Sequence, residues 1–185
     1  EARVGTYTLP NPLAFLDGKA VATAAGWYRK RRPQILALYK EDQFGRTPGR
    51  PAAMRFDVFD GGTPAFGGQA TRKQVTVYFT KDTAGPRMDL LLYLPAHAKG
   101  PVPVLLSPGF FPNSSRVADP GVRRGTMWDR DHHRVAAPQK SPFGEFDVLR
   151  LTSQGIGVAM VYYGDIEPDF AGGIPGGYSR LLTID

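Results

Sequence analysis

Two short apolar runs constrain the fold of this chain more than any other feature. Residues 102–106 and 158–163 are almost continuously apolar, and a long segment separates them. A strand that is apolar on both faces is typical of a parallel sheet covered on both sides. Between the runs, Phe146 and Leu149 share one side of a segment at residues 145–154 that ends at Gly155, as expected of a helix with a C-terminal glycine. The pattern predicts a parallel β-α-β unit with two buried strands.

Three segments upstream of this unit alternate apolar with polar residues, at positions 54–58, 75–79 and 88–94. Stretches rich in Gly, Pro and Asp separate them, so an antiparallel β-meander is the economical arrangement. A meander that leads into a parallel β-α-β unit is how the sheets of α/β hydrolases begin. The predicted class is therefore α/β, with a partial α/β-hydrolase fold.

The N-terminal part is expected to wrap this sheet. Residues 1–26 are rich in turn-forming Pro, Asn, Asp and Gly, which indicates an extended arm. From Trp27 on, Ile35, Leu38 and Tyr39 recur at helical spacing, with Pro33 in the first turn and Gly45 past the end. We expect one domain over residues 1–185, in which the arm (1–26) precedes the helix, meander and β-α-β unit (27–185).

Composition narrows the possible functions. The chain has 185 residues with 42% apolar content, no cysteine and a net charge of +6. The missing cysteines exclude disulfides, thiolate metal sites and a cysteine nucleophile. The positive charge would suit DNA or an acidic polysaccharide, but it is spread thinly instead of forming one stripe, so no nucleic-acid partner is predicted. No apolar run is long enough to span a membrane. A start at Glu1 fits an exported protein whose leader was removed, and it fits equally a sequence that was trimmed.

A serine hydrolase of this fold needs a strand, a Gly-x-Ser-x-Gly turn and a helix in succession. The nearest stretch surrounds Ser179, between Gly177 and Leu181. The residues before it are too glycine-rich for a buried strand, and no glycine follows Arg180. No catalytic residue is therefore assigned within this chain.

Other polar clusters favour structural roles. His132 and His133, with Asp129 and Asp131, could form a metal site, but adjacent histidines do not share a helical face and two arginines flank them, so a solvated loop is favoured. Three carboxylates follow the last apolar run and could serve glycosidase chemistry, yet their Asp/Pro/Gly setting is typical of a turn. They are Asp165, Glu167 and Asp169. Neither a metal nor a cofactor is predicted.

Five segments together resemble, in the same order, the N-terminal half of the glucuronoyl esterases of carbohydrate esterase family 15. They are residues 9–13 (Leu-Pro-Asn-Pro-Leu), Trp27 with residues 31–36, residues 44–48 (Phe-Gly-Arg-Thr-Pro), residues 91–95 (Leu-Leu-Tyr-Leu-Pro) and residues 162–169 (Tyr-Tyr-Gly-Asp-Ile-Glu-Pro-Asp). The Tyr-Tyr-Gly-Asp stretch is the most specific of these.

The resemblance implies a metal-free serine esterase that cleaves the ester between 4-O-methyl-glucuronic acid on xylan and lignin alcohols, and it favours a secreted or periplasmic location. It also implies that the triad and the G-C-S-R-x-G-K signature lie beyond this chain, in the missing C-terminal half of the same domain. A family loop of the Asn-Phe-x-Gly-Asn-His type matches Phe110 and Asn113, whereas Gly109, Pro112 and Ser114 depart from it.

In α/β hydrolases the corresponding loop can supply a backbone N–H to the oxyanion hole and form a wall of the pocket. Our candidates for this substrate-binding or oxyanion loop are Gly109, Phe110, Phe111 and Asn113. The alternative is a non-catalytic module, which either binds acidic glycan through its scattered basic residues or has a structural role.

Overall fold

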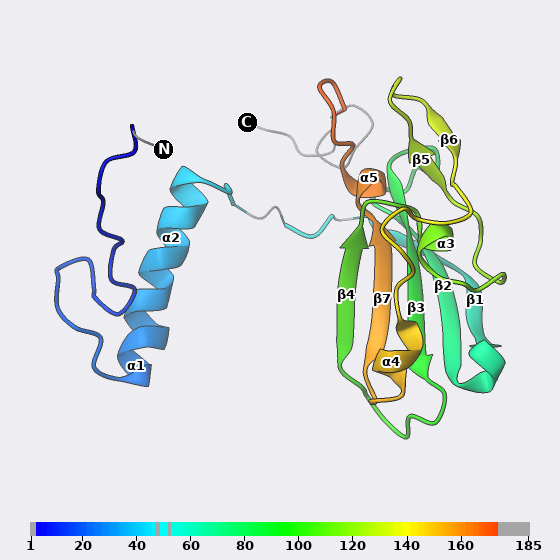
Figure 1. Ribbon diagram of the computed structural model, residues 1–185, viewed down its shortest axis with the longest axis horizontal. Coiled ribbons are helices and arrows are strands. Elements are labelled where there is room, and N and C mark those ends of the chain that lie inside the picture. Colours follow the sequence, from blue (N-terminus) through cyan, green and yellow to red (C-terminus); the bar gives the residue numbers. More distant parts are fainter. Residues whose placement is uncertain (1–2, 47–48, 52, 174–185) are drawn as a thin grey trace. The chain divides into compact units, whose positions relative to one another are not determined.

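The computed structural model describes residues 3–46, 49–51 and 53–173 (Figure 1). The chain separates into two compact units, Glu1–Gly49 and Arg50–Asp185. The expectation that the arm, the helix and the sheet pack into one domain over residues 1–185 stays a prediction. Among the described residues, no helix has the length and apolar character needed to cross a membrane.

The first unit contains one continuous helical segment and the arm that precedes it. The segment consists of α1 (Ala24–Gly26), a π-helical turn (Trp27–Arg31) and α2 (Arg32–Asp42). Thr23 caps its first turn through Oγ1, Pro33 lies in the first turn of α2, and Gly45 has a φ of 69° just beyond its end. The buried Arg31 donates from Nε to the carbonyl oxygen of Pro12 at 3.1 Å, which ties the arm to this helix. The predicted helix is confirmed.

The second unit is built on one mixed sheet with the strand order β1-β2-β3-β7-β4 (Figure 1). The strands are β1 (Arg55–Ala65), β2 (Ala70–Tyr78), β3 (Arg87–Pro95), β4 (Val104–Gly109) and β7 (Gly157–Tyr162), and a 3-10 turn (Phe66–Gly68) joins β1 to β2. β1, β2 and β3 form an antiparallel meander, β3 pairs antiparallel with β7, and β4 runs parallel to β7. The predicted α/β class, a meander leading into a parallel pair, is confirmed.

A short helix, α4 (Val148–Thr152), lies between the two parallel strands in sequence. Asp147 caps it by accepting a hydrogen bond from the backbone N–H of Arg150 at 3.0 Å, and Gly155 follows it with a φ of 81°. The helix is shorter than the predicted 145–154. The reason at its start is the backbone of Asp147, whose ψ of 80° is not helical, so the helix begins at Val148.

The prediction of two buried parallel strands is right for β7 and wrong for β4. Every residue of β7 is buried, because this strand has neighbours on both sides. In β4, Val104, Leu105 and Leu106 are 47%, 46% and 60% exposed. Among the described residues, β4 pairs on one side only and is an edge strand.

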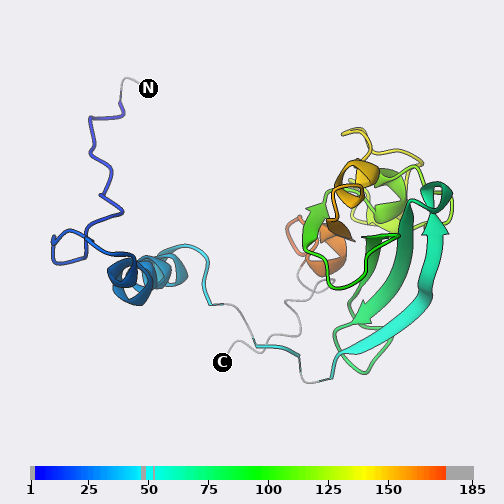
Figure 2. The ribbon, with the colours of Figure 1, turned by 90° about the horizontal axis from the view of Figure 1, so that it is seen from below.

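The core lies between the centre of the sheet and the short helices. α3 (Asn113–Arg116) and α4 pack against β3 and β7, on one side of the curved sheet (Figure 2). Apolar side chains of these strands and of the segments around the helices fill the space. They include Leu91, Tyr93, Val117, Val148, Val158 and Met160.

The long segment after β4 gathers at the carboxyl end of the parallel pair. It contains α3 and then a small antiparallel hairpin of β5 (Thr126–Trp128) and β6 (Arg134–Ala136). A further short helix, α5 (Tyr163–Ile166), directly follows β7 at the same end (Figure 1). In open α/β sheets, ligands bind at this edge of the parallel strands.

Candidate active site

The predicted oxyanion loop lies where the two parallel strands end. Gly109, the last residue of β4, is the register partner of Tyr162, the last residue of β7. Residues 109–112, called here the 109–112 turn, connect β4 to α3. The pairing places this turn beside the start of α5, so two chain segments far apart in sequence meet at one edge of the sheet.

Three of the four predicted residues line one cavity. Gly109, Phe110 and Phe111 border a hollow of about 310 Å³ whose further walls include Phe143 and Phe146. The Phe110 ring, 65% exposed, lies 5.3 Å from the Tyr163 ring in an edge-on contact, and Phe111 makes a similar contact with Phe143 at 5.8 Å. The turn thus presents an aromatic wall beside its backbone groups.

Asn113 does not line this hollow. It is buried, and its Nδ2 donates to the carbonyl oxygen of Asp89 in β3 at 2.8 Å, which fixes the start of α3 on the sheet. It borders a second cavity of about 500 Å³, which Gly109, Phe110 and Phe111 do not line. The structure therefore places Asn113 as a support of the turn, and the oxyanion role of all four residues stays a prediction.

The second cavity is lined by residues of the hairpin and of α5 that contact each other. Arg134 donates to Asp165 at 2.8 Å and to the carbonyl oxygen of Gly164 at 3.1 Å. Trp128 also donates from Nε1 to the carbonyl oxygen of Gly164, at 2.9 Å, and its ring lies 4.5 Å beneath the Arg134 guanidinium. These contacts hold the hairpin against the end of β7.

Asp165 is the one carboxylate of the predicted acidic turn that faces this cavity among the described residues. Burial raises the pKa of Asp165, and the hydrogen bond from Arg134 opposes that rise. Its ion pair with Arg134 gives it a structural task, because it joins the hairpin to α5. This geometry agrees with the favoured structural interpretation.

The histidine loop is built by local hydrogen bonds. Asp129 Oδ1 accepts from the backbone N–H groups of Asp131 and His133 at 2.9 and 2.8 Å. His132 has a φ of 63°, and its ring stacks on Phe170 at 3.9 Å. Within the described part of the chain, no group of three or more His, Asp or Glu side chains could hold a metal ion. The stretch around Ser179 lies outside the described residues.

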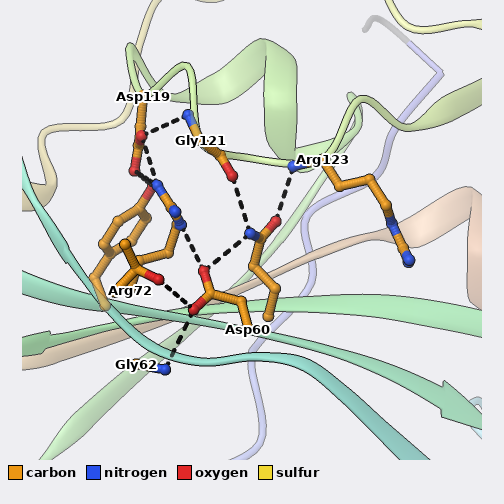
Figure 3. A network of polar contacts seen from close by, with 9 residues as sticks. Asp60, Gly62, Arg72, Asp119, Gly121 and Arg123 are labelled. Atoms are coloured by element: carbon orange, nitrogen blue, oxygen red, sulfur yellow. Dashed lines mark hydrogen bonds and ion pairs between the residues drawn. The ribbon is translucent and has the colours of Figure 1, made fainter.

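A buried polar network supports the segment that follows α3, and the sequence did not reveal it (Figure 3). Arg72 of β2 donates from Nε to Asp60 of β1 and from Nη1 to Asp119 of the connection, each at 2.8 Å. Tyr93 of β3 donates from its hydroxyl to Asp119 at 2.8 Å. Gln74 bonds to Asp60 and to the backbone of residues 121 and 123. The network ties three strands to the connection.

The two carboxylates of this network are held in the ionised form. Burial by itself raises the pKa of Asp60, but hydrogen bonds from Arg72, Gln74 and Thr63 outweigh it and lower that pKa to about 2. Burial likewise opposes a net lowering of the pKa of Asp119, which is produced by hydrogen bonds that include those from Tyr93 and Arg72. The sequence around Asp119 and Gly121 is typical of a turn, but it does not indicate that these residues contact Arg72 and Gln74 of β2.

The sheet order, the parallel strand pair and the loop at its carboxyl end define part of an α/β-hydrolase-like domain. Solved structures carry the comparison further. A glucuronoyl esterase from Solibacter usitatus is 42% identical with a TM-score of 0.88, and the match covers 100% of this chain and 48% of that chain. A promiscuous CE15 esterase from a marine bacterial metagenome is 34% identical with a TM-score of 0.71, over 91% of this chain and 44% of that one.

A curated relative agrees with these structures. The carbohydrate esterase MZ0003, from an unknown prokaryotic organism, is 35% identical over 178 residues, which are 92% of this chain and 41% of the relative. No family model matches the sequence. The resemblance to carbohydrate esterase family 15 is confirmed, and the chain spans less than half the length of these relatives.

Proposed function

We propose that this chain forms the scaffold and one pocket wall of a serine carboxylic ester hydrolase. The observation that carries the proposal is the 109–112 turn at the carboxyl end of β4. It lies in a chain of which all 185 residues match part of a glucuronoyl esterase structure, at 42% identity. The nucleophilic serine and its triad partners would come from the remaining part of the same domain. In that arrangement the 185 residues alone do not turn over an ester.

The chemistry assigns different tasks to the two sides of the turn. Attack on an ester carbonyl places negative charge on its oxygen, and backbone N–H groups aimed at that position stabilise it. The turn would contribute such a donor, while Phe110 and Phe111, which line the cavity, would form the apolar wall beside the reacting group. The proposed substrate is a 4-O-methyl-glucuronate ester of xylan, with a lignin alcohol as leaving group. A polymer of the plant cell wall requires a secreted or periplasmic enzyme.

The alternative, a non-catalytic module for acidic glycans, needs cations that are free to bind a ligand. Three arginines of the second unit are instead paired with aspartates, at separations of 2.5 to 2.8 Å. They are Arg72, Arg123 and Arg134. These pairs remove three cations from those that could contact a glycan, whereas the esterase is favoured by the similarity to carbohydrate esterases.

The test is hydrolysis by the intact protein that contains this chain. Incubation with methyl glucuronate should release methanol, whereas a catalytic-serine variant should release none. Binding to glucuronoxylan without turnover of methyl glucuronate or of simple aryl esters would contradict the proposal and support the glycan-binding module.

A further inference from the structure

Arg116 spans the 109–112 turn. It is the last residue of α3, and its guanidinium reaches back to Ser107 in β4. Nη1 donates to the carbonyl oxygen of Ser107 at 3.0 Å, and Nη2 donates to its Oγ at 2.7 Å. The side chain therefore joins the strand that enters the turn to the helix that leaves it.

Gly109 provides the space for this contact. A Cβ atom at this position would lie 2.4 Å from Cζ of Arg116, well inside the closest approach of two carbon atoms. The φ angle of Gly109 is outside the left-handed region, so the backbone itself does not require glycine. The guanidinium occupies the space above Gly109, and a Cβ there would displace it.

The other side chains of α3 already hold the helix in place. Asn113 bonds to β3, as described above, and Ser115 donates from Oγ to the carbonyl oxygen of Pro138. Ser114 accepts from the backbone N–H of Gly125 at 3.2 Å. What Arg116 adds is the direct link between α3 and β4 across the turn.

Arg116 makes this link at a cost. It is half-buried, burial lowers the pKa of its guanidinium, and no carboxylate pairs with it among the described residues. Its remaining contact is the ring of Phe146, 5.7 Å away. A partly desolvated cation without a counter-ion is unfavourable unless its hydrogen bonds compensate. The bonds to Ser107 supply that compensation and confine the guanidinium to one position.

We propose that Arg116 is a positioning residue for the ester site, which holds the 109–112 turn in one conformation so that its backbone N–H groups are preorganised for the substrate carbonyl. This inference rests on the proposed function. Preorganised donors contribute to the transition state more than to substrate binding, and a displacement on the order of 1 Å can cost up to about 100-fold in rate.

The first test replaces Arg116 in the intact protein. Arg116→Gln should lower kcat for methyl glucuronate about tenfold and change KM by less than about twofold. Arg116→Lys keeps the charge but loses the two-pronged contact, so its kcat should fall nearly as far. Arg150→Gln is the matched control, because Arg150 is an exposed arginine of α4, and its kcat should not change.

The second test is a double-mutant cycle with Gly109. Gly109→Ala should displace the guanidinium and lower kcat about as much as Arg116→Gln does. Because both changes break the same contact, the double variant should be no slower than either single variant. If the fold-losses of kcat in the two single variants multiply in the double variant, the two residues act separately and the inference is overturned.

Hydrogen exchange separates this inference from the proposed function. In the intact protein, the backbone amides of residues 109–111 should exchange about tenfold faster in Arg116→Gln than in the wild type, since Pro112 has no amide hydrogen. If the wild type hydrolyses no ester, the proposed function fails, and the exchange rates still decide whether Arg116 holds the turn. If the wild type is active and Arg116→Gln retains its kcat, the inference alone is wrong. If Arg116→Gln does not fold, Ser107→Ala replaces it as the test, because it removes one of the two acceptors of Arg116. A loss of kcat smaller than tenfold would then support the inference, and an unchanged kcat would overturn it.

Discussion

Replacement of Arg72 by methionine tests whether the buried network is stabilised by its central cation. The side chains of Arg72, Asp60 and Asp119 are 10%, 9% and 8% exposed. Arg72→Met preserves most of the apolar volume and leaves two carboxylates without a cation. Breaking a buried pair from one side costs about 3 to 5 kcal/mol in general. We expect the free energy of unfolding at pH 7 to fall by about 3 kcal/mol.

The loss should depend on pH in a defined direction. In the wild type the lowered pKa of Asp60 stabilises the fold above pH 3.8, and this contribution disappears as pH falls toward 2. The difference between 3.8 and about 2 corresponds to roughly 2 kcal/mol as an upper value. In Arg72→Met the carboxylates lose their cation and take up protons more readily. The deficit of the variant should therefore shrink between pH 7 and pH 3.

Urea unfolding of the protein at several pH values measures this effect. Lys73→Met is the matched control, since Lys73 is the next residue of β2, points to the opposite face and has no ion pair among the described residues. It should change the free energy of unfolding by less than about 0.5 kcal/mol. A loss in Arg72→Met that equals the control, or that stays constant from pH 7 to pH 3, would refute the reasoning.

Three further substitutions probe other parts of the second unit, each by urea unfolding. Tyr93→Phe removes the hydroxyl donor of a fully buried side chain and leaves Asp119 with one partner fewer, so we expect a loss of about 1 to 2 kcal/mol. Gly155→Ala places a Cβ at a φ of 81° in open space, so only backbone strain of about 1 kcal/mol should appear. Leu106→Asp should cost more than about 2 kcal/mol in the intact protein if β4 is covered there, and less than about 0.5 kcal/mol if it stays exposed.

The strands were predictable because their signal is local. Alternation over a few residues located β3 to within one residue at each end, but it covered only the first half of β1 and the second half of β2. It did not identify the buried face of β1, where Phe56 and Val58 are 52% and 57% exposed. The parallel pair followed from two apolar runs with a helix between them. The turn after β4 was also predictable, since its place depends only on where that strand ends.

The polar contacts were not predictable, because each joins residues whose proximity depends on the whole fold. Arg72 and Asp119 are 47 positions apart, and they meet only because the connection returns over β2. Asn113 has the same residue type as the family loop, but its hydrogen bond to the backbone of β3 shows that it supports the turn. Arg116 carries no signal in the sequence, since nothing local indicates that its guanidinium lies over Gly109.

The wrong prediction for β4 is itself informative. Val104, Leu105 and Leu106 give this strand the composition of one that is covered on both faces, yet each is at least 46% exposed. An apolar edge strand with open backbone groups is a site for pairing with another strand. The solved relatives are about twice as long as this chain, which spans 48% of the glucuronoyl esterase from Solibacter usitatus. The exposed apolar side chains of β4 therefore agree with the proposal that this chain is part of a longer esterase, in which further strands would cover this edge.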